Sequence, residues 1–148
     1  MRNIYLRVIG LFFTMFASLA MFGQQTLTIY PDGTGTSSQV PIYGSYSFRY
    51  LKCEYVIPAN QLTAMEDGTI SKMTFYLSSP ASSSWGGANF QVFLKQVDNT
   101  SISSYYGPSD ATIVYEGSLD GTQSTMDVVF STPYTYNGGN LWWVFTIR

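Results

Sequence analysis

The sequence contains no histidine, and this absence excludes the commonest designs of active site. A Ser-His-Asp triad, the usual general base and the most frequent zinc ligand all depend on imidazole. The nine carboxylates are scattered along the chain, and no phosphate-binding loop, zinc-protease helix or Gly-x-Ser-x-Gly turn occurs. A glycosidase would need two of these carboxylates to face each other across a cleft. We therefore predict a protein that is not an enzyme, and assign no catalytic residue and no metal ligand.

The chain is also poor in cysteine and in charge. Its single cysteine, Cys53, cannot form an internal disulfide, and without an imidazole to activate it we expect a small buried hydrophobic residue. Only 11% of the residues are charged, and the basic ones form no cluster. Nucleic acids and anionic membrane surfaces bind to such clusters, so neither is expected as a partner.

The first 24 residues have the pattern of a signal peptide. Arg2 and Arg7 precede the uncharged apolar run Val8–Phe22, which is shorter than the ~20 residues of a membrane-spanning helix. Cleavage is expected near Gly23, which predicts an exported protein, secreted or at the cell surface, with one domain over residues 25–148. The alternative is an uncleaved N-terminal anchor helix.

Two segments with an apolar residue at every second position form the centre of the predicted fold, Ile70–Leu77 and Ala88–Val97. This period is typical of strands in a sheet with one buried face. We expect the two strands to face each other across the glycine- and serine-rich connection between them. The predicted core positions are Met73, Phe75, Leu77, Phe90, Val92 and Leu94, which alternate with Lys72, Thr74, Tyr76, Gln91, Phe93 and Lys95.

More strands are predicted around this pair, separated by turn signals such as Pro-Asp-Gly and Asp-Gly. One turn of helix is expected over Pro58–Met65, where a proline stands at the start. Pro133 is expected to close the strand that carries Met126, Val128 and Phe130. A total of about seven or eight short strands predicts an all-β fold, an antiparallel, jelly-roll-like β-sandwich. The further strands are Thr26–Tyr30, Val40–Tyr43, Tyr46–Ile57, Thr112–Glu116 and Leu141–Arg148.

The last predicted strand, Leu141–Arg148, is strongly apolar and contains Trp142 and Trp143. Such a strand needs a neighbour on each side. A chain that stops within it is expected to leave a hydrophobic edge unprotected, which favours aggregation. We therefore predict a sandwich that is incomplete at its C-terminus.

Eight segments, in their order and spacing, resemble a known family. Together they are similar to an N-terminal domain of large secreted Bacteroidetes proteins of the surface or adhesin type, over nearly all of residues 26–141. The resemblance implies a jelly-roll β-sandwich followed by fibronectin type III-like or adhesin-like modules and a C-terminal sorting signal, and it implies no catalytic residue. The segments are Tyr30–Thr34, Val40–Gly44, Tyr50–Cys53, Ile57–Ala59, Met73–Tyr76, Phe90–Lys95, Val114–Gly117 and Pro133–Leu141.

The resemblance ends at Leu141. Where the family continues with a segment similar to Leu-Val-Gly-Phe-Tyr, this chain has Trp142–Arg148. Loss of a single T from a leucine codon converts the family pattern into the present one. We therefore hypothesise a truncated copy whose last residues are read in a shifted frame. Sequencing the DNA beyond the codon for Arg148 tests this, because the hypothesis fails if no other frame encodes further sandwich strands.

Aromatic residues are abundant, with 3 Trp, 12 Tyr and 10 Phe, and three of them are candidates for ligand binding. Trp85 lies in the glycine- and serine-rich connection, and Tyr105 and Tyr106 lie in the long loop Asp98–Asp110. Such rings can stack on the face of a sugar. The alternative, more usual in β-proteins, is that Trp85 folds back over the edge of the sandwich and the tyrosines line sheet faces.

Calcium is the one cofactor that the sequence leaves open. Asp98, Asp110 and Asp120 lie in predicted loops, where carboxylates can bind Ca²⁺. They do not form an Asp-x-Asp-x-Asp pattern, and aspartates in turns commonly accept hydrogen bonds from nearby backbone N–H groups instead. We therefore expect no bound cofactor.

Two functions agree with these features. The favoured one is a non-catalytic, structural or interaction module of an exported, adhesin-type multidomain protein, with extracellular proteins or glycans as partners. The alternative is a carbohydrate-binding module that uses the loop aromatics. The two differ in one expectation, because sugar binding requires Trp85, Tyr105 and Tyr106 to form a single exposed platform.

Overall fold

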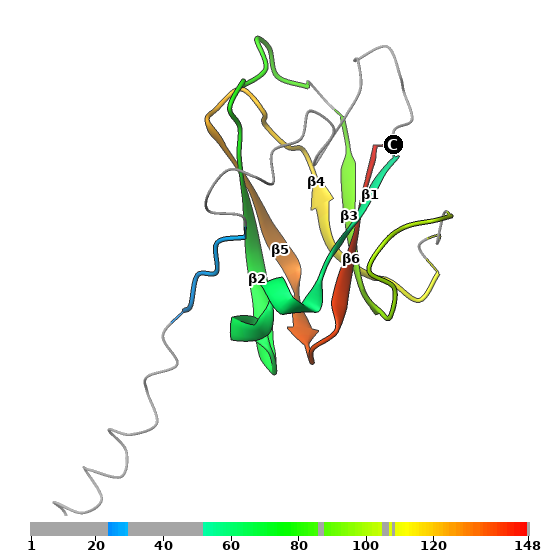
Figure 1. Ribbon diagram of the computed structural model, residues 1–148. Helices are drawn as coiled ribbons and strands as arrows, with labels where there is room; N and C mark the ends of the chain where they lie inside the picture. The colour runs from blue at the N-terminus through cyan, green and yellow to red at the C-terminus, as the bar shows by residue number, and fades with distance from the viewer. Residues whose placement is uncertain (1–23, 30–51, 86–87, 105–106, 108, 148) are drawn as a thin grey trace, which may run out of the picture.

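The computed structural model describes residues 24–29, 52–85, 88–104, 107 and 109–147. Within these ranges the regular structure is all β apart from two short 3₁₀ turns, and Figure 1 shows the strands in two layers. The elements are β1 (Lys52–Ile57), η1 (Ala59–Gln61), η2 (Thr63–Met65), β2 (Gly68–Tyr76), β3 (Phe90–Val97), β4 (Thr112–Gly117), β5 (Thr125–Tyr136) and β6 (Asn140–Ile147).

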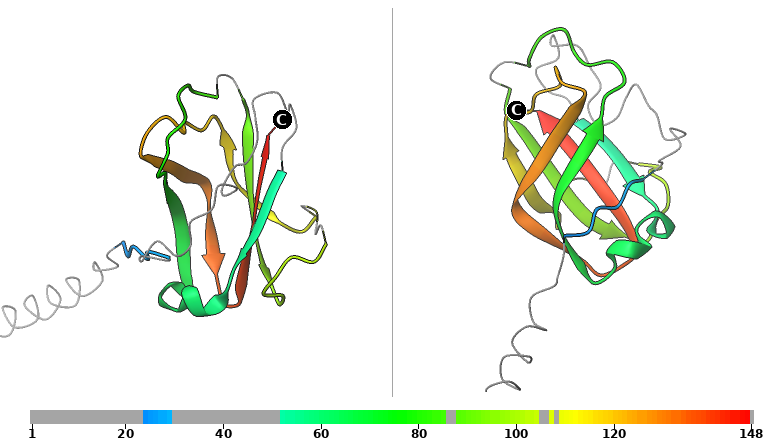
Figure 2. Two further views of the ribbon diagram at one scale, coloured as in Figure 1. Left: turned by 45° about the horizontal axis from the view of Figure 1, so that its top comes forward. Right: turned by 90° about the vertical axis from the view of Figure 1, so that its left-hand side faces the viewer.

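The strands form two antiparallel sheets that pack face to face. The larger sheet has the order β1-β6-β3-β4, and the smaller one consists of β2 and β5. Figure 2 shows the two layers side by side in its left view, and the smaller sheet in front of the larger one in its right view. The prediction of an all-β, antiparallel sandwich is confirmed.

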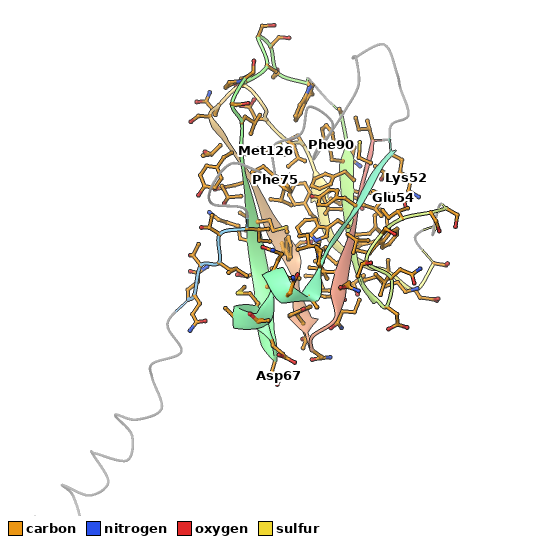
Figure 3. The ribbon with its side chains drawn as sticks, viewed as in Figure 1. Lys52, Glu54, Asp67, Phe75, Phe90 and Met126 are labelled. Carbon is orange, nitrogen blue, oxygen red and sulfur yellow. The ribbon has the colours of Figure 1, made fainter. Side chains whose placement is uncertain are left out.

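The main core lies between the two sheets and is filled by alternate residues of their strands. Val92 and Leu94 of β3 and Val128 of β5 have no exposed surface, and Met126 is 2% exposed. Phe75 of β2 packs against the same cluster and is labelled with Met126 in Figure 3. Burial of apolar surface at ~25 cal/mol per Å² makes this layer the main source of stability.

The two segments predicted to face each other are not neighbouring strands. β2 pairs with β5, whereas β3 lies between β6 and β4 in the other sheet. The expectation of one exposed side is also wrong for β3, since Gln91 and Phe93 are only 4% and 7% exposed. A central strand of a sheet that is covered on both faces has no solvent side for polar residues to occupy.

A second, smaller cluster covers the far face of the larger sheet. Phe93, Trp142 and Val144 are its buried members, and Ile102 and Ala111 of the β3–β4 connection pack against them. Ile102 and Ala111 therefore shield part of the larger sheet from solvent.

β6 is an interior strand of the larger sheet. Its two edges pair with β1 and with β3, and Trp142 and Trp143 are completely buried in the second cluster and the main core, respectively. The predicted unprotected hydrophobic edge is therefore wrong for Leu141–Ile147, because both neighbours come from the same chain. The pairing of β6 does not test the frame-shift hypothesis, which stays a prediction.

Pro133 does not end a strand, contrary to the prediction, because β5 continues beyond it. Between the pairs Ile70–Tyr134 and Lys72–Val129, the ladder advances two residues on β2 but five on β5. Pro133 lies in this bulge, where its missing N–H interrupts no ladder hydrogen bond.

The remaining local predictions have mixed outcomes. The helical turn over Pro58–Met65 is present as η1 and η2, with Leu62 buried. The part of Thr26–Tyr30 that is described forms no strand, although Leu27 and Ile29 pack against the main core. The predicted signal run, Val40–Tyr43 and the part of Tyr46–Ile57 before Lys52 lie outside the described residues. In the described ranges, no helix has the length and apolar character needed to cross a membrane.

Candidate functional site

Trp85, the first predicted ligand-binding residue, is half-buried at the edge of the main core. Its ring centroid lies 5.4 Å from that of Phe90, with 54° between the planes. The indole also lies so close to Gly121 that a Cβ there would stand 2.6 Å from Cη2 of the ring. Trp85 is therefore held against the sandwich. Tyr105 and Tyr106 lie outside the described residues, so their role stays a prediction.

The three candidate calcium ligands are not brought together. Asp98 and Asp110 stand near the two ends of the β3–β4 connection, where Asp110 Oδ2 lies 3.9 Å from Lys95 Nζ. Asp120 Oδ1 accepts a hydrogen bond from the backbone N–H of Thr122 at 2.9 Å, and this bond holds the pKa of Asp120 below its usual range. No group of three potential metal ligands occurs in the described part of the chain.

The smaller sheet presents an open surface on the side away from the core, which we call the β2–β5 outer face. Tyr76 is 75% exposed and Val129 is 59% exposed, the two largest exposures of big hydrophobic side chains in the described ranges. Cross-strand partners share a face of a sheet, so the register defines the members of this surface. They are the pairs Lys72–Val129, Thr74–Asp127 and Tyr76–Thr125.

A charged group at the middle of this face is neutralised within the face itself. Asp127 Oδ2 lies 3.0 Å from Lys72 Nζ, and Asp127 Oδ1 accepts a hydrogen bond from Thr74 Oγ1 at 2.6 Å. The Thr74 hydroxyl, and after it the Lys72 ammonium, lower the pKa of Asp127. The β2–β5 outer face therefore combines one exposed aromatic ring, one exposed aliphatic side chain and a self-neutralised polar centre.

Sequence reasoning identified only half of this surface. The alternation in Ile70–Leu77 correctly placed Lys72, Thr74 and Tyr76 away from the core. The spacing of Met126, Val128 and Phe130 at every second position carried the signal for the other half, because it leaves Thr125, Asp127 and Val129 for the opposite side. What the sequence lacked was the pairing of the two strands, because 48 or more residues separate partners in the ladder.

On the larger sheet, the polar side chains of the outer face are engaged with one another. Lys52, Thr146, Gln91 and Glu116 are successive cross-strand neighbours in one row. The Gln91 amide donates to Glu116 Oε2 at 3.0 Å, and the Asn89 amide donates to Glu116 Oε1 at 3.3 Å. Glu116 therefore holds two side chains of the neighbouring segment in place.

Glu54 connects this polar row with the second apolar cluster. Its Oε1 lies 3.0 Å from Lys52 Nζ, and its Oε2 accepts a hydrogen bond from the Trp142 indole N–H at 3.3 Å. Figure 3 shows Lys52 and Glu54 on β1, on the side of the larger sheet away from the smaller one. Only 9% of the Glu54 side chain is exposed, so this nearly buried carboxylate stabilises the larger sheet through its contacts with Lys52 and Trp142.

Two polar atoms inside the main core have no hydrogen-bond partner among the described residues, Tyr55 OH and Trp143 Nε1. The rings that carry them are stacked, with centroids 5.8 Å apart and planes 13° from parallel. Burial, and to a smaller extent the neighbouring Cys53, raises the pKa of the Tyr55 hydroxyl well above its ordinary value. The raised pKa favours the neutral form of this phenol within the core.

Comparisons of the chain with models of known protein families, with curated proteins and with solved structures found no match.

Proposed function

We propose that this protein is a non-catalytic interaction module, originally part of a larger exported surface protein of the adhesin type. The observation that supports the proposal best is the β2–β5 outer face, where Tyr76 and Val129 stand exposed beside the paired Lys72 and Asp127. Exposed aromatic and aliphatic side chains around a polar centre are typical of surfaces that bind other molecules. The resemblance to the N-terminal domains of secreted Bacteroidetes surface proteins agrees with this role.

The arrangement of the carboxylates supports contact rather than catalysis. Glu54 binds Lys52 and Trp142. Asp127 binds Lys72 and Thr74 on the other sheet. Side chains that are held in cross-strand contacts stabilise the sheets and are not poised to transfer protons to a substrate.

The partner that fits this face is a neutral extracellular macromolecule. The positive charge of Lys72 is offset by Asp127 at 3.0 Å, so the face favours neither an anionic nor a cationic ligand. Tyr76 supplies a flat apolar surface with a hydroxyl at its end. An extracellular protein is the proposed partner, and glycan binding is the outcome that would favour the alternative function.

A binding experiment with matched variants tests the proposal. The exported chain is applied to immobilised extracellular proteins and to a panel of neutral polysaccharides. Tyr76→Ser combined with Val129→Thr should abolish retention of the chain on the immobilised extracellular proteins. Ile113→Thr, which removes an exposed side chain of the larger sheet, should not. Equal retention of all three proteins would remove the proposed face.

Two further readouts separate the alternatives. Retention on polysaccharide that is lost in Trp85→Ala but kept in the Tyr76 variant would support the carbohydrate-binding function instead. A reproducible hydrolytic rate from purified protein, unaffected by further purification, would overturn the non-catalytic assignment.

A further inference from the structure

The turn between β5 and β6 contains the chain's one Asn-Gly pair, Asn137-Gly138. It joins the end of β5, in the smaller sheet, to the start of β6, in the larger sheet, at the lower end of the molecule in Figure 1. Asn137 is exposed, and Gly138 has φ of +96°, which side-chain-bearing residues rarely adopt. In this turn, therefore, a solvent-exposed asparagine directly precedes the backbone nitrogen of a glycine, which has no side chain to hinder it.

We propose that Asn137 is a site of spontaneous covalent modification, at which its side-chain amide is lost and aspartate or isoaspartate forms. The backbone nitrogen of Gly138 attacks Cγ of Asn137 and forms a C–N bond. The bond from Cγ to Nδ2 breaks, and ammonia leaves with the proton that the Gly138 nitrogen gives up. Water then opens the cyclic imide at one of its two carbonyls, which yields aspartate or isoaspartate.

The surroundings leave the Asn137 amide available for this reaction. No hydrogen bond of the Asn137 side chain is found among the described residues, and only its backbone N–H is held, by Gln96 Oε1 at 2.9 Å. Asn140, at the other end of the turn, differs in this respect. Its Oδ1 accepts from the N–H of Ala59 and its Nδ2 donates to the carbonyl of Asp98, both at 2.9 Å.

The product would carry a negative charge into an acidic end of the sandwich. A Cβ at Gly138 would stand 2.9 Å from Glu66 Oε1, which shows that this carboxylate abuts the turn. Asp67 is next to it in sequence, and Gly68 pairs with Tyr136, so both carboxylates lie near position 137. Neighbouring negative charges repel each other, and isoaspartate in addition inserts one backbone carbon into the turn.

The same turn is closed by a hydrogen bond from Tyr136 OH to the carbonyl of Gly139, at 2.6 Å. A lengthened backbone between these residues works against that bond. Modified protein is therefore expected to unfold at lower denaturant concentration than fresh protein, with part of the loss recovered at high salt.

Peptide mapping of the full chain after storage at mildly alkaline pH tests the proposal. We expect ammonia loss and an isoaspartate signal at Asn137 before either appears at Asn60 or Asn99, which are also exposed but precede residues with side chains. Retention of the Asn137 amide while Asn60 or Asn99 reacts would overturn it. Retention in the folded chain while the unfolded chain reacts at Asn137 would overturn it too, because the turn would then be protective.

Two variants test the consequence separately from the chemistry. Asn137→Ser should abolish the charge shift seen by isoelectric focusing of stored protein and should keep the stability of fresh protein. Asn137→Asp should lower the denaturation midpoint relative to Asn137→Ser, and the difference should shrink with added salt. A charge shift that persists in Asn137→Ser would place the modification elsewhere and overturn the assignment.

Discussion

The indole of Trp85 lies directly against Gly121, so that a Cβ at position 121 would stand 2.6 Å from Cη2 and 2.8 Å from Cζ2 of the ring. Contacts between real Cβ atoms and other atoms are essentially never this short. The glycine therefore provides the space in which the tryptophan closes the edge of the main core. A residue predicted from the sequence as a candidate sugar contact is in this way part of the packing of the sandwich.

Gly121→Ala is expected to displace the indole and to destabilise the protein by about 1–3 kcal/mol. The measurement is denaturant unfolding, followed by the fluorescence of Trp85 as it moves toward water. The control is a double-mutant cycle, because in a Trp85→Ala background the added methyl group meets no ring. A cost of Gly121→Ala that is unchanged in that background would show that the ring is not its cause.

Trp142 and Trp143 should respond differently to replacement by phenylalanine. The Trp142 indole N–H donates to Glu54 Oε2, whereas Trp143 Nε1 has no partner among the described residues. Both replacements remove the same volume from a fully buried position, so the difference reports the polar contribution. We expect Trp142→Phe to cost about 1–3 kcal/mol more than Trp143→Phe.

The unfolding free energies of these two variants, measured in urea under one set of conditions, check this expectation. Glu54→Gln in the Trp142→Phe background is the control, because it removes the charge that the indole would otherwise stabilise. Equal losses in the two tryptophan variants would contradict the assigned hydrogen bond.

Asp127 predicts a pH dependence of stability at acidic pH. Its pKa is lowered in the folded protein, chiefly by the Thr74 hydroxyl and then by Lys72. A carboxyl group with a lowered pKa contributes stability that is complete above its unfolded pKa of about 4 and is lost as the pH falls through the folded value. Because the side chain is 48% exposed, we expect a contribution below about 1 kcal/mol.

Urea unfolding at neutral pH and at stepwise lower pH measures this contribution as the difference between wild type and Asp127→Asn. The difference should shrink toward zero in acid. Thr74→Val should reduce it more than Lys72→Met, in the order of the two causes. A difference that grows as the pH falls would have the wrong sign and would reject the assignment.

Asn140 is expected to be the most sensitive position of the turn before β6. Its side chain joins two segments that lie far from it in the sequence, through the N–H of Ala59 and the carbonyl of Asp98. Asn140→Ala leaves the partly buried Ala59 donor unpaired and should destabilise the protein by about 1–3 kcal/mol. Asn140→Asp keeps an acceptor for that donor and should cost less, and thermal unfolding of the two variants decides the order.

The sequence was sufficient to predict where most of the described strands lie and which side of several of them faces the core. Met73 and Phe75 are two residues apart, as are Met126 and Val128, and these four side chains pack in or against the main core. Their alternation is a local property, set by the two-residue period of an extended backbone. The same period failed for Phe93, which the second cluster buries, and for Gln91, whose amide is bound to Glu116.

The candidate site was predictable only in part, because it depends on contacts between segments that lie far apart in the sequence. Lys72, Thr74 and Tyr76 were correctly placed on a solvent side, but their partners on β5 could not be named. Trp85 was correctly located between two strands, and yet its contact with Gly121 depends on a turn 36 residues later. Such contacts arise from packing in three dimensions and leave no periodic signal in the chain.

The sequence by itself determined that the chain forms alternating antiparallel strands, and it excluded every mechanism that needs an imidazole, because strand faces and side-chain chemistry are properties of neighbouring residues. Only the tertiary structure decided that β6 lies between β1 and β3, and that β2 pairs with β5 and not with β3. Strand order depends on which apolar faces can be buried together, and that choice is made by the whole chain at once.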